Sequence, residues 1–424
     1  MICESNSHLN IFRGSSLKPV QFYNSFQLIH RSENISKSHN HTASSTYDPL
    51  DGGTQDSSVF VNQTIIRKPK PIVIGYLTNF YGRQSLTRQG LVISGAISYA
   101  IDHINNAFPN LLNGRHLELI YNDTSASAVN GTAALISQWR SGAVAFFGPE
   151  DTCEVEATIA AALNLPMISY KCANSAVSNK GLFPTFARTH PPDVIVMRSV
   201  VALLKYYLWH KFSIVYKNSP KFSPMVSSLR SEASNEKLTV TVEYPFEDHF
   251  ECCIKKENCC GKIWTTLVDQ TYKKTRIYVF LGDGSSLEHF LLALKSRGLL
   301  DSGDYIVISV DLDEEYHFEN QTYPFINQRT DLPIHEIIAI NEASRSLLKI
   351  ARSVPKSPYY DNFVEQVRNY NKRAPFSLND RMDLQRHITY YAAYLYDAVI
   401  LYAEALAQVS KQYFYSSQSN MEPT

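Results

Sequence analysis

Residues 144–170 read VAFFGPEDTCEVEATIAAALNLPMISY, and this stretch decides the fold. It starts with an apolar run at 144–147, continues with helical spacing of apolar residues at 154–163, and returns to an apolar run at 166–170. Short runs that are apolar throughout are typical of parallel strands covered on both faces. The stretch therefore predicts a strand, a helix and a second, parallel strand.

The same alternation continues on both sides of this unit. Residues 71–80 (PIVIGYLTNF) and 116–121 predict two more strands, with helices at 86–108 and 130–140. A second series begins after a long helix at 194–209. Its expected strands are 212–216, 238–244, 277–282, 305–310 and 347–351, and its expected helices are 225–234, 263–273, 287–297, 361–370 and 384–412. Two such series predict an α/β fold with two doubly wound parallel-sheet lobes.

These patterns also divide the chain into parts. Residues 1–70 are crowded with Ser, Asn, His and Thr and keep no apolar period, which indicates a disordered N-terminal arm. The other expected parts are lobe 1 at 71–187 plus 375–412, lobe 2 at 188–374, and a polar tail at 413–424. Because no strand follows the last expected helix, we expect that the chain is cut short at Thr424.

Charge and motifs exclude several classes of function. The 424 residues contain 40 Lys and Arg against 40 Asp and Glu, so the zero net charge gives no electrostatic argument for a nucleic acid or an acidic membrane as partner. The hydrophobic fraction of 44% suffices for a large core, and the length suggests two or three domain-sized units. No dinucleotide or P-loop motif follows a strand, and neither Gly-x-Ser-x-Gly nor His-Glu-x-x-His occurs. We therefore expect no catalytic residues, no cofactor and no metal.

One turn has the position of an anion site. Residues 282–286 (GDGSS) stand between a predicted strand and a predicted helix, where backbone N–H groups can hold an anion. No Lys follows the turn, as it does in a P-loop. We interpret it as a tight strand-to-helix turn capped by Ser285 or Ser286.

The N-terminal opening and the glycosylation sequons give conflicting indications of the cellular compartment. The opening MICESNSHLNIFRGSSLKPV lacks the apolar run of about 7 to 15 residues that a secretory signal requires. Asn-x-Ser/Thr sequons suggest the opposite, although such sequons also arise by chance. They begin at Asn34, Asn40, Asn62, Asn122, Asn130 and Asn320. A faulty or alternative first exon would account for the conflict.

The apolar stretch 388–406 has about the length of a membrane span. Asp397 and Glu404 lie seven residues apart on one helical stripe, which Tyr390 and Lys411 continue. Such a stripe predicts an amphipathic helix with these residues facing water, and charges inside lipid would be costly. We expect no span in this chain.

Cysteine positions predict disulfides. Cys153 and Cys172 follow two neighbouring strands of the predicted sheet and so leave the same edge, within reach of a disulfide; two buried free thiols are the alternative. A Cys-Cys-x5-Cys-Cys loop follows in lobe 2, formed by Cys252, Cys253, Cys259 and Cys260. Disulfides are the preferred interpretation there, because adjacent cysteines rarely present both thiolates to one zinc ion.

Ligands of open α/β sheets bind outside the carboxyl ends of the strands. That rule gives as candidates Asn79, Phe80, Tyr81, Gly148, Glu150, Asp151, Ser169, Tyr170, Asp283 and Asp311. Each is also open to interpretation as an ordinary turn residue. Arg188 lies at the expected crossover between the lobes and is the candidate hinge, with a structural ion pair as the alternative.

Five segments between Pro71 and Gln412 carry a family resemblance. They are PIVIGYLTNF, GAISYAIDHINN, FFGPEDTCEVEATIAAALNLPMISYKCANSAVSNKGLFPTFARTHPPD, ARSVPKSPYYDNFVEQVRNYN and YYAAYLYDAVILYAEAL. Together they resemble the extracellular ligand-binding domain of receptor-type guanylyl cyclases, of the natriuretic-peptide-receptor kind. The succession GPxxxC, PMISYxC and FPTFxRT also looks like that of the wider family of glutamate receptor amino-terminal domains and periplasmic binding proteins. The resemblance implies the type I periplasmic-binding-protein fold, with two hinged lobes.

The resemblance also implies a function. A homodimer outside the cell would bind a ligand and pass a rearrangement through one membrane span to a kinase-like and a cyclase domain. None of those later parts is in this sequence, so a truncated gene model or a shortened isoform is expected, with the membrane reached only through the missing parts. The loop at 171–174 (KCAN) lacks the Ser and Thr hydroxyls with which amino-acid receptors of the family hold their ligand, which counts against a small amino-acid ligand and favours the peptide-receptor branch; the expected partner is a peptide or small-molecule ligand. The alternatives are a soluble decoy, an amino-acid-receptor-type domain, and an enzyme without a recognisable motif.

Overall fold

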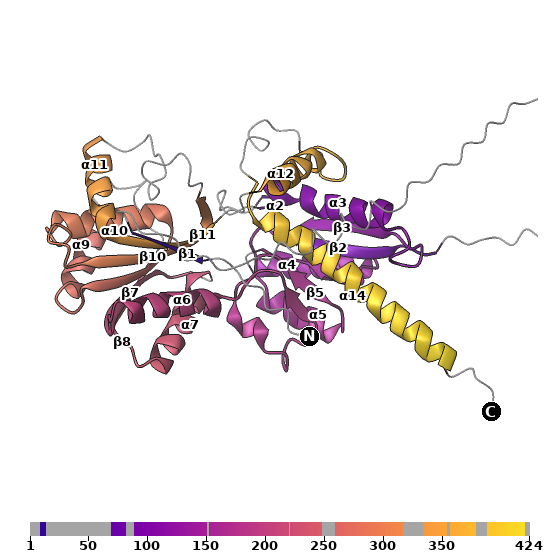
Figure 1. The fold of residues 1–424 in the computed structure, drawn as a ribbon, viewed down its shortest axis with the longest axis horizontal. Coiled ribbons are helices and arrows are strands. Elements are labelled where there is room, and N and C mark those ends of the chain that lie inside the picture. The colour runs from indigo at the N-terminus through magenta and orange to yellow at the C-terminus, as the bar shows by residue number, and fades with distance from the viewer. Residues whose placement is uncertain are drawn as a thin grey trace, which may run out of the picture.

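The computed structural model describes residues 9–13, 69–81, 89–150, 152–219, 221–247, 259–316, 334–353, 357–378 and 388–419. These residues form two α/β lobes that lie side by side (Figure 1). Each lobe contains one sheet with five parallel strands and with helices on its faces. The predicted α/β class with two doubly wound lobes is therefore confirmed.

Lobe 1 has the strand order β3-β2-β4-β5-β6. The strands are β2 (Ile72–Thr78), β3 (Leu117–Asp123), β4 (Ala145–Phe147), β5 (Met167–Ser169) and β6 (Phe186–Arg188). The helical elements between them are α2 (Gly90–Ile93), α3 (Gly95–Asp102), the π-helical turn η1 (His103–Ala107), α4 (Ala128–Arg140), α5 (Glu154–Ala162) and the 3-10 turn η2 (Ser175–Ser178). The sequence does not predict β6, because its three residues are too few to show a period.

Lobe 2 repeats the same order as β8-β7-β9-β10-β11. Its strands are β7 (Lys211–Lys217), β8 (Thr239–Phe246), β9 (Ile277–Leu281), β10 (Ile306–Tyr316) and β11 (Leu347–Ser353). Its helical elements are α6 (Asp193–Tyr206), α7 (Phe222–Asn235), α9 (Cys259–Thr271), α10 (Gly284–Ser296), α11 (Ile334–Ala343) and η3 (Ser344–Ser346). All five predicted strands of this lobe are present, whereas α11 was not predicted.

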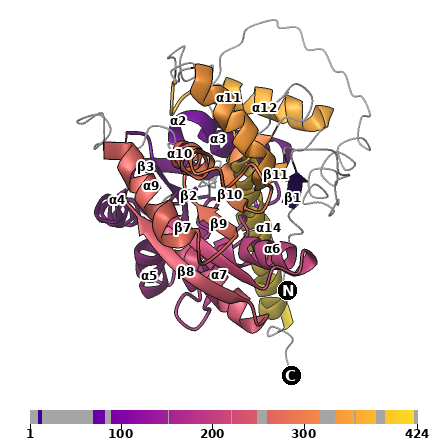
Figure 2. The same cartoon turned by 90° about the vertical axis from the view of Figure 1, so that its left-hand side faces the viewer.

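Side-chain alternation along β9 shows why its run is apolar throughout. Ile277, Val279 and Leu281 pack into the core beneath α6 and α7. Tyr278 and Phe280 point to the opposite face, into the core beneath α9 and α10. Figure 2 shows the two helix pairs on opposite sides of the sheet. A strand covered on both faces needs apolar residues at every position.

One short segment corrects the expectation of a disordered arm at 1–70. Leu9–Arg13 forms strand β1, which pairs antiparallel with β11 at the edge of the lobe 2 sheet. An edge strand presents unpaired N–H and C=O groups, which a five-residue segment of the same chain can satisfy. Of the remaining arm, the structure describes only residues 69 and 70.

The chain returns from lobe 2 to lobe 1 earlier than the expected boundary at 374. Helix α12 (Pro358–Asn371) packs on α3 and contributes Phe363 and Val367 to the core of lobe 1. Asn371 donates from Nδ2 to the Val92 carbonyl (2.7 Å) and accepts from the Gly95 N–H (2.5 Å). The structure therefore places the return crossover between β11 and α12.

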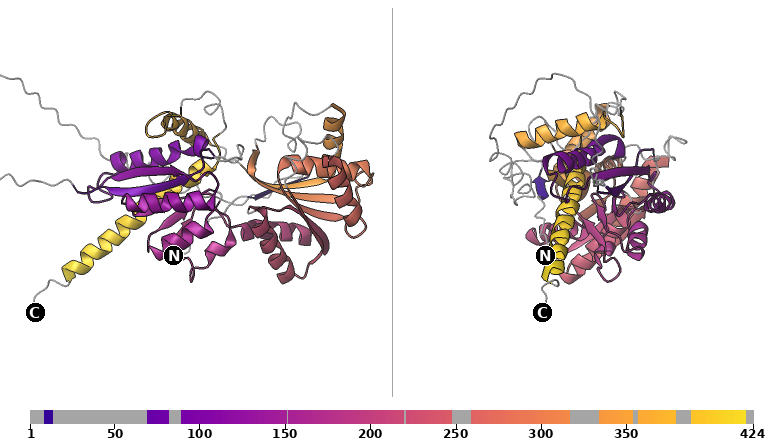
Figure 3. Two further views of the ribbon diagram at one scale, coloured as in Figure 1. Left: turned by 180° about the vertical axis from the view of Figure 1, so that it is seen from behind. Right: turned by 90° about the vertical axis from the view of Figure 1, so that its right-hand side faces the viewer.

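Helix α14 (Tyr391–Ser419) runs along lobe 1 and extends beyond it (Figure 3). None of the helices in the described part of the chain combines the length and the apolar character needed to cross a membrane. The expected water-facing stripe is correct for Glu404 and Lys411, which are exposed, and wrong for Tyr390 and Asp397, which are buried and half-buried. The reason is that the first half of α14 packs against the core of lobe 1. The helix also continues past Gln412, where a polar tail without pattern was expected.

The first crossover, residues 189–192, is attached to α14. Thr189 donates from Oγ1 to the Tyr394 carbonyl (2.8 Å). His190 is 2% exposed and stacks on the Tyr391 ring, with ring centroids 5.6 Å apart. The segment that joins the lobes thus shares side-chain and backbone contacts with the longest helix of lobe 1.

Candidate functional site

Both sheets have a switch point, where strand order reverses and where ligands of such folds bind. It lies between β2 and β4 in lobe 1 and between β7 and β9 in lobe 2. Only residues 189–192 separate the carboxyl end of β6 from α6 of the other lobe, and only residues 354–357 separate β11 from α12. The carboxyl ends of both sheets therefore flank the crossovers.

The lobe 1 switch point is organised around the Glu150 carboxylate, which is 3% exposed. It accepts hydrogen bonds from the backbone N–H of Asn79 (3.0 Å), the backbone N–H of Gln89 (3.0 Å) and the Tyr170 hydroxyl (3.1 Å). The Thr78 hydroxyl also donates to it. Two convergent N–H groups and two hydroxyls form a cradle for an anion, and the chain's own carboxylate fills that cradle.

Tyr170, Gln89 and Gly148 help to hold the Glu150 carboxylate in place. Burial, and then the Glu150 charge, raise the pKa of Tyr170 well above its ordinary value, so its hydroxyl remains a donor. The Gln89 side chain accepts from the Thr389 hydroxyl (2.6 Å), just before α14. Gly148 has φ of +104°, and a Cβ there would lie 2.1 Å from the Leu77 carbonyl oxygen. Only glycine fits at this position, which leads the chain from β4 to Glu150.

A second carboxylate closes the loop after β2. Asp123, at the end of β3, accepts from the backbone N–H of Phe80 (2.7 Å) and the backbone N–H of Ser125 (3.1 Å). Burial opposes ionisation of Asp123, but the hydrogen bonds from Ser125 and Phe80 outweigh it and lower its pKa. Phe80 is buried against Tyr121 and Phe376, whereas Tyr81 is 76% exposed. The rings of Phe80, Tyr121 and Phe376 therefore pack together beside the loop that follows β2.

Ser169 and Arg188 fix the loop that follows β5. The Ser169 hydroxyl accepts from the Cys172 N–H (2.9 Å). Arg188 donates to the carbonyls of Cys172 (3.2 Å) and Asn174 (3.0 Å) and lies in β6 rather than in the crossover itself. Burial lowers the pKa of Arg188 to about 10, against the opposing charge of Asp193. A hinge role for Arg188 stays a prediction.

The same loop carries a disulfide. Cys153 and Cys172 are bonded, with their Cα atoms 6.1 Å apart. The bond joins the start of α5 to the loop after β5, at the carboxyl edge of the sheet. Cys252 and Cys253 lie outside the described residues, and Cys259 and Cys260 lie in α9 with side chains that are not described.

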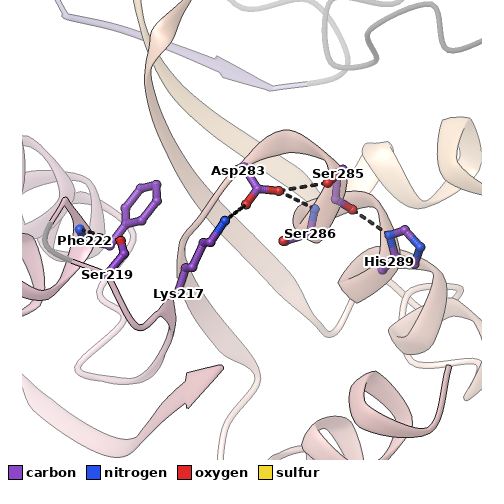
Figure 4. Close-up of polar contacts among 7 residues, drawn as sticks. All are labelled: Lys217, Ser219, Phe222, Asp283, Ser285, Ser286 and His289. Atoms are coloured by element: carbon purple, nitrogen blue, oxygen red, sulfur yellow. Dashed lines mark hydrogen bonds and ion pairs between the residues drawn. The ribbon is translucent and has the colours of Figure 1, made fainter. Parts of the chain in front are cut away.

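The lobe 2 switch point repeats the arrangement with an ion pair (Figure 4). Lys217, at the end of β7, donates to Asp283 Oδ2 (3.0 Å), and Asp283 Oδ1 accepts from the Ser286 N–H (2.9 Å). Asp283 therefore caps α10, and the expected caps Ser285 and Ser286 are donors to it instead. Burial opposes ionisation of Asp283, yet the Ser286 N–H and the Lys217 charge lower its pKa to about 2.

The remaining predicted positions are placed as follows. Asp311 pairs with Ala351 in the sheet, but its side chain is not described, and Asp151 lies outside the described residues. Asn122 and Asn130 are exposed, as glycan acceptors must be. Asn34, Asn40, Asn62 and Asn320 lie outside the described residues. No group of three potential metal ligands occurs in the part of the chain that the structure describes.

Sequence reasoning missed the partners of these carboxylates. Thr78, Asp123 and Lys217 each end a strand, so the rule that selected the other candidates was sufficient to find them. Gln89 contributes through its backbone N–H, for which side-chain chemistry gives no signal. The structure brings Asn79, Glu150 and Tyr170 into one hydrogen-bonded group. Phe80 and Tyr81 bond to Asp123 instead, Ser169 bonds to the loop after β5, and Asp283 belongs to a separate group in lobe 2.

Two lobes of identical strand order, joined by crossovers beside their switch points, define a two-lobed fold of the ligand-binding type. Residues 92–423 match the family described as receptor family ligand binding region, and the chain belongs to that family. It is 39% identical over 350 residues to the receptor-type guanylate cyclase Gyc76C of Drosophila melanogaster, covering 80% of this chain and 22% of the relative.

Two further relatives define the range of the similarity. The speract receptor of Strongylocentrotus purpuratus is 29% identical, with 75% of this chain and 29% of the relative covered. Glutamate receptor 3.4 of Arabidopsis thaliana is 23% identical, with 60% of this chain and 26% of the relative covered. The chain thus spans less than a third of the length of these relatives, and its predicted resemblance to the ligand-binding region of receptor guanylate cyclases is confirmed.

Proposed function

We propose that this chain is the extracellular ligand-binding region of a receptor guanylate cyclase that binds a peptide-type ligand and signals by rearrangement of a homodimer. The family match and the identity to Gyc76C support the receptor class. The observation that carries the ligand class is the filled lobe 1 switch point. Glu150 occupies the donors that a small anionic ligand would need, so such a ligand would have to displace a buried carboxylate. A polypeptide can bind outside the strand ends without doing so.

An extracellular location agrees with two features of lobe 1. The Cys153–Cys172 disulfide is typical of oxidising compartments. The sequon residues Asn122 and Asn130 are exposed. Glycan occupancy at these two positions, measured by mass spectrometry on protein secreted behind an added signal peptide, tests the location.

The exposed face of α4 and α5 supports the homodimer. Val129, Ile136 and Trp139 share one side of α4 and are 77%, 39% and 46% exposed, and Val155 of the neighbouring α5 is 48% exposed. Arg140 and Glu154 are also exposed and bring opposite charges to this face. A two-fold axis would let the two charges meet across a self-complementary contact. Trp139→Asp should convert a dimer into a monomer in sedimentation equilibrium, whereas Tyr206→Asp, at an aromatic of lobe 2 that is 79% exposed, should not.

A chimera tests the signalling function. The C-terminus of this chain is fused to the membrane span and cytoplasmic part of Gyc76C, and cellular cGMP is measured on exposure to fractionated peptides. A rise in cGMP that is lost after the fractions are digested with protease supports the proposal. A response to free amino acids that survives digestion would favour the amino-acid-receptor alternative, for which the plant glutamate receptor match is the observation.

A further inference from the structure

A pocket of about 470 Å³ opens on lobe 1 beside the edge strand β3, and none of the functions above uses it. Its walls come from α3, the π-helical turn η1, the start of β3 and the turn after α12. Figure 1 shows α3 and α12 near β3 in lobe 1. The volume lies within the range of small-molecule sites in proteins.

One side of the pocket presents a fixed carboxylate. Asp102 accepts from Asn106 Nδ2 (2.7 Å) and from the Tyr370 hydroxyl (2.6 Å). Burial, and then the Asp102 charge, raise the pKa of Tyr370 to about 12, so the hydroxyl keeps its proton and remains a donor to Asp102. With two donors already holding it, the exposed carboxylate has lone pairs left for a ligand cation.

The other side presents a guanidinium. Arg373 lines the pocket and lies over the Tyr370 ring, 4.5 Å from its centroid. Among the described residues no carboxylate lies within salt-bridge distance of Arg373. The guanidinium is therefore held against Tyr370, with which it also shares a side-chain hydrogen bond, while its remaining donors can bind an anion.

Two apolar side chains also line the pocket, and the π-helical turn η1 is attached to the strand that carries one of them. Ile101 and Leu119 line the pocket and pack against the lobe 1 core. Asn105 in η1 accepts from the Leu117 N–H (2.9 Å) and donates to the Leu117 carbonyl (3.0 Å), which fixes η1 to β3. Single π-helical turns occur frequently at functional sites, because they re-aim the side chains that follow.

From this arrangement we propose that the pocket binds a free α-amino acid with an aliphatic side chain. The ammonium group binds Asp102, the carboxylate binds Arg373, and the side chain lies on Ile101 and Leu119. A single tyrosine, Tyr370, contacts both charged residues, so the pocket presents a carboxylate and a guanidinium on either side of one side chain. A ligand with one charge would pair with only one of these two exposed residues and so would make fewer charge-assisted hydrogen bonds.

The experiment titrates the full chain with L-leucine in a calorimeter and repeats the titration with two analogues. These are 3-methylbutylamine, which lacks the carboxylate, and 4-methylpentanoate, which lacks the ammonium group. L-leucine should bind with a dissociation constant of about 1 mM or below, and each analogue should bind about tenfold or more weakly, because each loses one charge-assisted hydrogen bond.

Matched variants locate the binding. Asp102→Asn and Arg373→Gln should each weaken L-leucine binding by about tenfold or more. Asp301→Asn and Arg276→Gln make the same chemical changes at exposed ion pairs of lobe 2 and should leave binding unaltered. The proposal is overturned if L-leucine gives no heat at about 10 mM, if one analogue binds as tightly as L-leucine, or if both pocket variants retain wild-type affinity. Because the measurement is equilibrium binding to this chain alone, its failure leaves the receptor proposal untouched.

Discussion

Replacing Glu150 by alanine tests whether the lobe 1 switch point is organised by this carboxylate. Among the described residues, the change removes the acceptor of two backbone N–H groups, at Asn79 and Gln89, and of the hydroxyls of Thr78 and Tyr170. The two hydroxyls are 3.4 Å apart and can pair with each other, so two buried N–H groups lose their acceptor.

The magnitude follows from those two groups. An unsatisfied buried donor costs about 1–3 kcal/mol, so the free energy of unfolding should fall by about 4 kcal/mol. For a lobe of about 200 residues this corresponds to a melting temperature lower by about 8–16 °C. The assay is thermal unfolding followed by circular dichroism, with Glu118→Ala on exposed β3 as the control that should change the melting temperature little.

Chemical rescue gives the sharper measurement. The cavity left by Glu150→Ala retains its donors, so formate should bind there and stabilise the variant by about 2.7 kcal/mol at one hundred times its dissociation constant. Wild-type protein has no such vacancy and should not respond. Equal melting temperatures for the variant and the wild type, or equal stabilisation of both by formate, would refute the argument.

Three other predictions concern the ionisable groups and the disulfide. The pKa of Asp283 is about 2 in the folded chain, below its unfolded value, so its stabilising effect is complete above pH 4 and is lost as the pH falls through 2. In urea unfolding, Asp283→Asn should therefore lose about 1 kcal/mol at neutral pH, after allowance for solvent screening, and much less at pH 2. Burial raises the pKa of Asp397 to about 7, so the folded chain favours the protonated carboxyl, and the free energy of unfolding declines as the pH rises from 4 through 7. The variant Asp397→Asn should lack this decline and should be more stable than wild type by about 1–3 kcal/mol at pH 8. The Cys153–Cys172 disulfide closes a loop with a sequence separation of 19, so Cys153→Ala should lower the free energy of unfolding by about 3 kcal/mol in non-reducing denaturant titrations. A reducing agent should abolish this difference between the variant and the wild type.

The sequence predicts those parts of the fold that a continuous apolar period specifies. The inner strands β2, β4, β5, β7, β9, β10 and β11 carry largely apolar runs because both faces of the sheet are covered there, whereas the edge strands β3 and β8 mix polar and apolar residues. Strand β6 is too short for a period, and β1 has no period because an edge strand is held by backbone pairing. The assignment of α12 to lobe 1 depends on the contact of Asn371 with Val92 and Gly95, which are far away in the sequence.

The candidate site was predictable to a similar degree. The strand-end rule finds Glu150, Tyr170 and Asp283 because topology alone places them at the switch points. It does not reveal that Glu150 itself is the bound anion, because that depends on the backbone direction at Asn79 and Gln89. The rule also led to Ser285 and Ser286 as caps where the structure uses Asp283, since a carboxylate with a nearby lysine is the stronger acceptor.

The attachment of the first crossover to α14 has a mechanical consequence. Thr189 and His190 hold Tyr394 and Tyr391, so these two residues stay with α14, and a rotation of lobe 2 would have to occur beyond His190 or break these contacts. The far end of this 29-residue helix is about 40 Å from its start at 1.5 Å per residue. Because the first half of α14 packs on the core of lobe 1, a change of a few degrees in the angle between the lobes would displace the far end of the helix by several ångströms relative to lobe 2.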